Sequence, residues 1–196
     1  PSAPGILPAR TLQEAALKAA AALQPGTLDV QATLDREASE LQGRALPIAE
    51  AVASGRTRLR GLFSGGTLAY EAQVIWQEML AEPVFSNAPL QAIHRMADSS
   101  RSQGHTIVDL GEEEFTVGRP HPMIDQDLRS RRIVQETHDP DVAVLILDLV
   151  LGYGAHPDPA SELATALGQA REAGIAVVAS VTGTQEDPQS LARQAQ

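Results

Sequence analysis

The spacing of hydrophobic residues changes near position 55. Before that point, apolar residues recur every three or four positions, which is the period of an amphipathic helix. Three segments have this pattern: Thr11–Leu23, Asp29–Leu41 and Leu46–Ser54. Gly43 is expected to end the second helix and Gly55 the third, because glycine commonly follows the last residue of a helix. Residues 1–55 are therefore predicted to form a helical N-terminal arm.

From residue 56 onward, short apolar runs alternate with helical patterns. The runs that predict strands are Leu59–Phe63, His105–Leu110, Val142–Val150 and Ile175–Val181. The helical patterns are Thr67–Ala81, a weak one over Leu90–Ala97, Ile124–Thr137, Ala160–Ala173 and a short one after Pro188. This alternation favours an open parallel sheet with helices on both faces. We therefore predict an α/β fold for residues 56–196, a flavodoxin-like doubly wound parallel sheet.

Candidate binding residues follow from the position of the loops. In a doubly wound sheet, ligands bind outside the carboxyl ends of the strands, near the point where the strand order reverses. Four predicted loops meet there: Ser64–Thr67, Gly111–Asp125, Gly152–Asp158 and Thr182–Asp187. The first loop leads from a strand through two glycines directly into a helix. A helix N-terminus attracts an anion through its free amides and partial positive charge, so its candidate anion-binding residues are Ser64, Gly65, Gly66 and Thr67. The alternative is a tight turn in which Ser64 or Thr67 caps the helix.

The second loop places a histidine between two prolines, Pro120-His121-Pro122. Because proline fixes the backbone, His121 is expected to be held rigidly and is a candidate catalytic residue that exchanges a proton. Gly118 and Arg119 precede it as candidate substrate-binding residues, since a guanidinium can grip an anion with two hydrogen bonds. The alternative is a rigid turn whose Asp125 caps the next helix.

The third loop follows the most apolar strand and contains a second His-Pro pair, His156-Pro157. Gly152 and Gly154 permit close approach of a ligand, so we count them as candidate substrate-binding residues. His156 is the second candidate catalytic residue. The alternative is again structural, with Asp158 capping the following helix.

Other charged residues are expected to be solvated or structural. Glu112-Glu113-Glu114 lacks the spacing of a calcium loop, and no metal site is predicted. The arginines at 129, 131 and 132 are predicted to form a solvated helix face. For Asp148, which lies inside a predicted buried strand, a functional role and a hydrogen-bonded structural role both stay open.

The amino-acid composition excludes several classes of site chemistry. Hydrophobic residues make up 43% of the 196 residues but aromatic residues only 3%, so the core must be aliphatic. The absence of cysteine excludes disulfides, zinc–thiolate sites and thiol nucleophiles. Lys18 is the single lysine and lies in an alanine-rich helical pattern, which disfavours phosphate-loop and Schiff-base chemistry.

The net charge of the chain limits the classes of molecule that it is expected to bind. The net charge of −10 argues against binding to nucleic acid or to an anionic membrane surface. No apolar run approaches the length of a membrane span, and no signal-peptide pattern opens the chain. We expect a cytoplasmic piece of a larger protein, whose partners are other domains or subunits and a small anionic substrate; a homo-oligomer is an alternative.

Three motifs together resemble FdrA-type proteins. They are the segment from Arg60 to Ala72 (RGLFSGGTLAYEA), the segment from Gly118 to Asp125 (GRPHPMID) and the segment from Asp148 to Asp158 (DLVLGYGAHPD). FdrA-type proteins are similar to acyl-CoA synthetases of the succinyl-CoA ligase superfamily, and these motifs resemble their carboxy-terminal ligase-CoA domain. The resemblance implies that the helix starting at Gly65-Gly66-Thr67 points toward a phosphohistidine supplied by another domain.

The resemblance also implies a function. It suggests one domain of an acyl-CoA-synthetase-like enzyme that binds an acyl- or carbamoyl-phosphate-type anion for acyl or phosphoryl transfer, and that is inactive alone. No cofactor is expected within this chain, whereas CoA and a nucleotide would belong to the full enzyme. The glycine-rich second loop of the ligases aligns with residues 117–120, where Arg119 and Pro120 replace further glycine. The alternatives are a subunit domain of an oxamate carbamoyltransferase in allantoin catabolism and a non-catalytic docking domain. A flavin-binding domain fits the fold, but this sequence offers few aromatic residues to stack on the flavin.

Overall fold

The structure is a computed structural model, and it describes residues 5–196; residues 1–4 of the predicted arm lie outside the described residues. The chain divides into two compact units, Pro1–Ala51 and Val52–Gln196, which we call the N-terminal unit and the sheet unit. Each is described by itself.

The N-terminal unit consists of two helices, α1 (Leu12–Leu23) and α2 (Val30–Ala51). The hydroxyl of Thr11 accepts a hydrogen bond from the amide of Glu14 at 3.1 Å, which confirms the cap at the start of α1. The carboxylate of Glu14 accepts from the amide of Arg10, one residue before the position that a capping box would use.

The predicted break at Gly43 is wrong. Helix α2 continues through Gly43 and Pro47 for 22 residues and replaces the two helices expected there. A glycine inside a helix costs only about 0.5–1 kcal/mol relative to alanine. Proline has no amide to donate to the carbonyl four residues earlier, which here belongs to Gly43. The two breaking residues therefore weaken the same turn of one helix instead of separating two.

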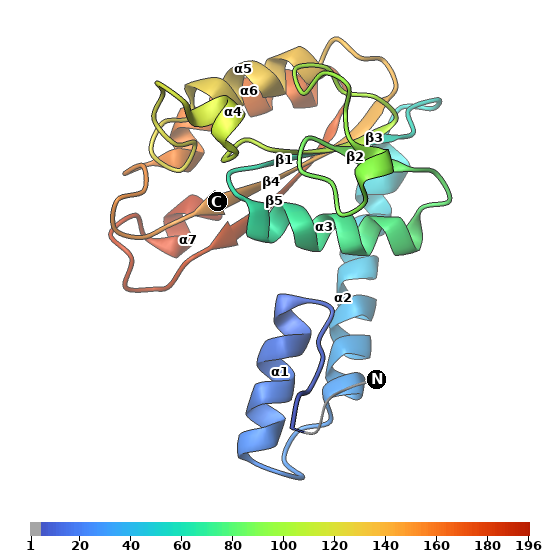
Figure 1. The fold of residues 1–196 in the computed structure, drawn as a ribbon, viewed down its shortest axis with the longest axis vertical. Coiled ribbons are helices and arrows are strands. Elements are labelled where there is room, and N and C mark those ends of the chain that lie inside the picture. Colours follow the sequence, from blue (N-terminus) through green and yellow to red (C-terminus); the bar gives the residue numbers. More distant parts are fainter. Residues whose placement is uncertain (1–4) are drawn as a thin grey trace. The chain divides into compact units, whose positions relative to one another are not determined.

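The sheet unit contains the predicted parallel sheet, which has five strands, one more than the four expected (Figure 1). The strands are β1 (Arg58–Phe63), β2 (Val84–Ser86), β3 (His105–Asp109), β4 (Val142–Val150) and β5 (Ala176–Thr182). Their order is β2-β3-β1-β4-β5, and every neighbouring pair is parallel. The α/β, flavodoxin-like fold class is thereby confirmed.

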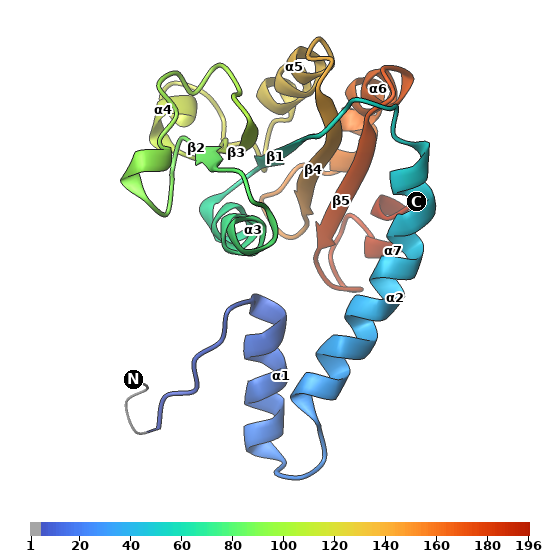
Figure 2. The ribbon, with the colours of Figure 1, turned by 90° about the vertical axis from the view of Figure 1, so that its right-hand side faces the viewer.

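Helices cover both faces of the sheet (Figures 1 and 2). The longer ones are α3 (Gly66–Met79), α5 (Asp127–Glu136) and α6 (Pro159–Glu172); the short ones are α4 (Glu113–Thr116) and α7 (Leu191–Gln194). Alternate strand residues point to opposite faces. Leu62 and Val108 thus join the core beneath α5 and α6, whereas Phe63 and Ile107 pack with Trp76 of α3.

Two elements between α3 and β3 differ from the prediction. The predicted helix over Leu90–Ala97 is reduced to a single 3₁₀ turn at Ala92–His94. The edge strand β2 was not predicted, because three residues, Val-Phe-Ser, are too few for a period to be recognised.

The arginines of α5 also differ from the prediction. Arg131 is exposed, as expected, but Arg129 and Arg132 are buried. Arg132 pairs with Glu136 at 2.7 Å, and the same carboxylate pairs with Arg60 of β1 at 2.8 Å. A buried charge persists in a fold only when it is paired in this way.

In the described part of the chain, no helix has the length and apolar character needed to cross a membrane.

Candidate functional site

The site lies where the strand order reverses. Strand β1 is central, with β3 on one side and β4 on the other, so the loops that follow these three strands are neighbours. Phe63 aligns with Asp109 in the sheet, and Leu62 aligns with Leu147. Ser64 therefore leaves the sheet between Asp109 of β3 and Asp148 of β4.

Asp148 holds the loop between β1 and α3. Its carboxylate accepts hydrogen bonds from the amide of Ser64 at 2.8 Å and from the hydroxyl of the same residue. Arg129 balances this buried carboxylate, with 3.5 Å between a guanidinium nitrogen and Oδ1, and it also donates to the Asp148 carbonyl. The hydroxyl of Ser64 is consequently used to fix the loop.

The N-terminus of α3 is open. Gly65, Gly66 and Thr67, which we call the α3 mouth, are half-buried or exposed. Gly65 stands at the N-cap position, and no side chain caps α3. A helix leaves its first amides without partners inside the helix, so the α3 mouth offers donors and the positive end of the helix dipole. Neither Ser64 nor Thr67 acts as the cap in the alternative turn.

Asp109 borders the α3 mouth. It is only 3% exposed, and its Oδ2 lies 3.1 Å from the point where a Cβ on Gly66 would stand. Its Oδ1 accepts from the amide of Gly111 at 2.9 Å. Burial raises the pKa of Asp109, and the negative charges of Glu112 and Asp148 add to this effect.

Gly111 brings His121 beside this carboxyl group. A Cβ on Gly111 would stand 2.9 Å from Nε2 of His121 and 3.1 Å from Oδ1 of Asp109, so only glycine leaves room for both. Nδ1 of His121 accepts from the amide of Met123 at 3.2 Å. In the neutral ring this leaves the proton on Nε2, the nitrogen closer to Gly111.

The second and third loops are joined by a main-chain hydrogen bond. The amide of His156 donates to the carbonyl of Met123 at 2.7 Å, and Nδ1 of His156 accepts from the amide of Asp158. The side chain of Met123 approaches to 3.9 Å from the Cβ position of Gly65. The loop of His121 thus contacts the α3 mouth through Met123, and the loop of His156 is joined to that loop.

The remaining candidate residues belong to other parts of these loops. Gly118 adopts a φ of +71°, and Arg119 is exposed; among the described residues its guanidinium makes no ion pair. Gly152 and Gly154 line a separate cavity of about 170 Å³ with Tyr153 and Gln189. The buried Gln189 fixes this loop, because its amide group donates to and accepts from Gly152.

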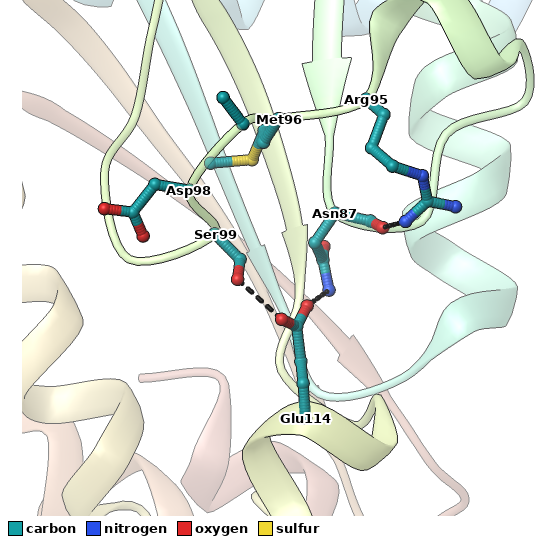
Figure 3. Close-up of a pocket in the computed structure, with 7 residues that line it drawn as sticks. Asn87, Arg95, Met96, Asp98, Ser99 and Glu114 are labelled. Carbon is teal, nitrogen blue, oxygen red and sulfur yellow. Dashed lines mark hydrogen bonds between the residues drawn. The ribbon is translucent and has the colours of Figure 1, made fainter.

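A polar pocket of about 300 Å³ lies beyond the end of β2 (Figure 3). Asn87 at its base accepts from the amide of Asp109 and donates to the Asp109 carbonyl, both at 2.9 Å. The same side chain donates to Glu114, whose second oxygen accepts from Ser99 (Figure 3). Glu114 is therefore fixed by two hydrogen bonds and is not simply part of a solvated loop. The network fixes the backbone at the end of β3.

The sequence was compared with those of known protein families. The family model for CoA-ligase matches residues 62–196. This range includes the whole α3 mouth and all five strands except the first residues of β1. This match covers well over half of the chain, and the chain belongs to the CoA-ligase family.

One curated relative is similar over almost the whole chain. It is the uncharacterized protein YahF of Escherichia coli (strain K12), 36% identical over 200 residues. The match covers 98% of this chain and 37% of that protein. The chain thus spans little more than a third of the length of this relative, and the similarity extends into the N-terminal unit.

The prediction from sequence missed one carboxylate and left the role of another open. Asp109 was not singled out, and the role of Asp148 stayed open between function and structure. Both stand at the carboxyl ends of buried strands, a position that carries polar residues mainly where loops or ligands meet. That position was the signal available in the sequence, and only the strand order reveals that both flank Ser64.

Proposed function

We propose that this chain is the carboxy-terminal ligase-type domain of a larger acyl-CoA-synthetase-like enzyme of the FdrA type. Within it the α3 mouth binds an acyl- or carbamoyl-phosphate-type anion for acyl or phosphoryl transfer. The observation that carries the proposal is the uncapped N-terminus of α3 at the strand reversal of a CoA-ligase fold. CoA and nucleotide would bind to other domains or subunits, and this domain alone would be inactive.

The residues would divide the work as follows. The amides of the α3 mouth would hold the anion and stabilise the negative charge that develops during transfer. His121, whose ring lies against Gly111, would orient the substrate or transfer a proton. Ser64 and Asp148 would keep the loop in place. Arg119 and His156 would act on the bound substrate only if their loops close further over the mouth.

A titration tests this proposal. Calorimetry with phosphate, sulfate and carbamoyl phosphate should detect binding to the wild-type protein. Gly66→Val should abolish it, because even a Cβ would stand 3.1 Å from Asp109 and 3.2 Å from Tyr70 at the mouth. Gly168→Ala in α6 is the matched control, since a Cβ there meets nothing within 4 Å. Absent binding by the wild type, or equal binding by Gly66→Val, would reject the proposal.

A docking domain is the second candidate. The exposed Tyr153, at 95% accessibility beside Gly152 and Gly154, favours a surface that meets another domain or subunit. In that case Tyr153→Ser would weaken association with the remainder of the enzyme, whereas Gly66→Val would leave association unchanged. A pull-down between separately expressed parts of the full-length protein distinguishes the two outcomes.

A further inference from the structure

Asp109 occupies an unusual position at the α3 mouth. It is the last residue of β3 and is almost completely buried. One carboxyl oxygen accepts from Gly111, whereas the described residues provide no hydrogen bond to the other oxygen, Oδ2. Oδ2 is the oxygen that lies against Gly66, the first residue of α3. A carboxyl oxygen that accepts no hydrogen bond from the described residues thus lies at the place where an anion would bind.

Two acidic groups near Asp109 oppose its ionisation, whereas His121 favours it. Asp148 faces it from β4 and Glu112 from the following loop, and both are acidic. The one arginine nearby in this network, Arg129, pairs with Asp148. His121 lies beside Oδ1, and the ring of Tyr70 from α3 reaches to 3.2 Å from the Cβ position of Gly66. In the described part of the chain, Asp109 forms no ion pair.

The two protonation states of Asp109 differ in what they allow at the α3 mouth. An ionised Asp109 can itself act as the anion at the positive end of α3. A protonated Asp109 can instead donate a hydrogen bond to an oxygen of a ligand bound at the same place. The ionised carboxylate and a bound anion cannot occupy this site together without strong repulsion, because two like charges in a partly desolvated site exclude each other.

We propose that Asp109 must be protonated for an anion to bind at the α3 mouth, so that each anion binds together with one proton. This inference rests on the proposed function and adds a condition to it. The ligand is an oxyanion that can accept a hydrogen bond from a carboxylic acid. Asn87 supports the arrangement, since its side chain holds the amide and the carbonyl of Asp109 and leaves only the carboxyl group to respond.

The pH dependence of sulfate binding tests this inference, because sulfate keeps its charge over the whole range used. The wild-type affinity, measured by calorimetry, should fall about tenfold per pH unit above the pKa of Asp109, since one proton is taken up per anion. In Asp109→Asn the side chain is permanently neutral and can donate from its amide group. This variant should bind sulfate as tightly at about pH 8 as at about pH 5.

Two further variants keep the result unambiguous. His121→Gln removes the imidazole that lies beside Oδ1 of Asp109, and it should retain the tenfold fall per pH unit. Asp98→Asn, on an exposed aspartate that lines the pocket of Figure 3, should behave as the wild type. Calorimetry in two buffers of different ionisation enthalpy gives the number of protons taken up directly, about one for the wild type and none for Asp109→Asn.

The outcomes separate the two proposals. If the wild-type protein binds no sulfate even at about pH 5, the anion site itself is rejected. If it binds sulfate but Asp109→Asn retains the wild-type pH dependence, the anion site stands and the role of Asp109 is overturned. If His121→Gln alone abolishes the pH dependence, the proton belongs to His121 and the inference is likewise overturned.

Discussion

The amide and the hydroxyl of Ser64 both donate to the carboxylate of Asp148, a residue 84 positions later in the chain. This pair connects the end of the central strand β1 to its neighbour β4. Because the donors are on the residue just before the α3 mouth, the pair determines where the helix begins. Arg129 completes the cluster from α5, so one loop is held by residues of two other elements.

The first prediction concerns this cluster. Asp148→Ala should lower the free energy of unfolding by about 3–5 kcal/mol, because it leaves the buried guanidinium of Arg129 without a counter-charge. Urea unfolding followed by circular dichroism measures the change. Asp127→Ala is the control: it removes an exposed ion pair with Arg131 on the same helix and should cost less than about 1 kcal/mol. Equal effects of the two substitutions would contradict the buried pair.

The second prediction concerns the pH dependence of stability. Burial raises the pKa of Asp109 in the fold, so the folded protein holds this proton more tightly than the unfolded chain. Stability is therefore lost as pH rises from the pKa of an unfolded aspartate, about 3.9, through the raised pKa of the folded state. Asp109→Asn removes this loss and should be more stable than the wild type at neutral pH.

Unfolding at several pH values measures this effect. The stability gained by Asp109→Asn should shrink as the pH falls toward about 3, where the wild-type carboxyl group is largely protonated in both states. Glu113→Gln, on an exposed residue of α4, provides the control and should show no such trend. A constant difference across the pH range would mean that the substitution acts by another route.

The third prediction concerns helix α2. Since Gly43 lies inside a continuous helix and a Cβ there meets nothing within 4 Å, Gly43→Ala should stabilise the helix by about 0.5–1 kcal/mol. Gly26→Ala is the contrasting change, because Gly26 has a φ of +82° between α1 and α2 and alanine is strained there. Thermal unfolding followed by circular dichroism should give shifts of opposite sign. If Gly43→Ala destabilised the protein, the continuous helix through Gly43 would be contradicted and the predicted break would be supported.

Helices and strands could be predicted where the apolar pattern that defines them extends over many residues. The nine-residue run of β4 was predicted with its bounds at Val142 and Val150, because an apolar run of that length fits a strand covered on both faces. The parallel sheet followed from the alternation of such runs with helices. The break predicted at Gly43 failed because a glycine inside a helix costs only about 0.5–1 kcal/mol, which is too little to stop a long helix.

Charged residues in the core were not predictable from their local pattern. Arg129 and Arg132 occupy helix positions that look solvated. Arg129 is buried against Asp148 of β4, and Arg132 against Glu136 of its own helix, whose carboxylate also pairs with Arg60 of β1. The α3 mouth could be predicted, since two glycines between a strand and a helix are adjacent in sequence. The position of Asp109 at this mouth could not be predicted, because it depends on the pairing of β3 with β1 in the folded sheet.

Gly111 is the spacer between three segments that converge from far apart in the chain. Any side chain there would stand 2.7 Å from the carbonyl oxygen of Ser64 while also meeting His121 and Asp109. Even a methyl group would push apart the backbone that leads into α3 and the imidazole that follows β3. Mutational tolerance at this position should accordingly be among the lowest in the sheet unit, although Gly111 itself has no side chain with which to perform chemistry.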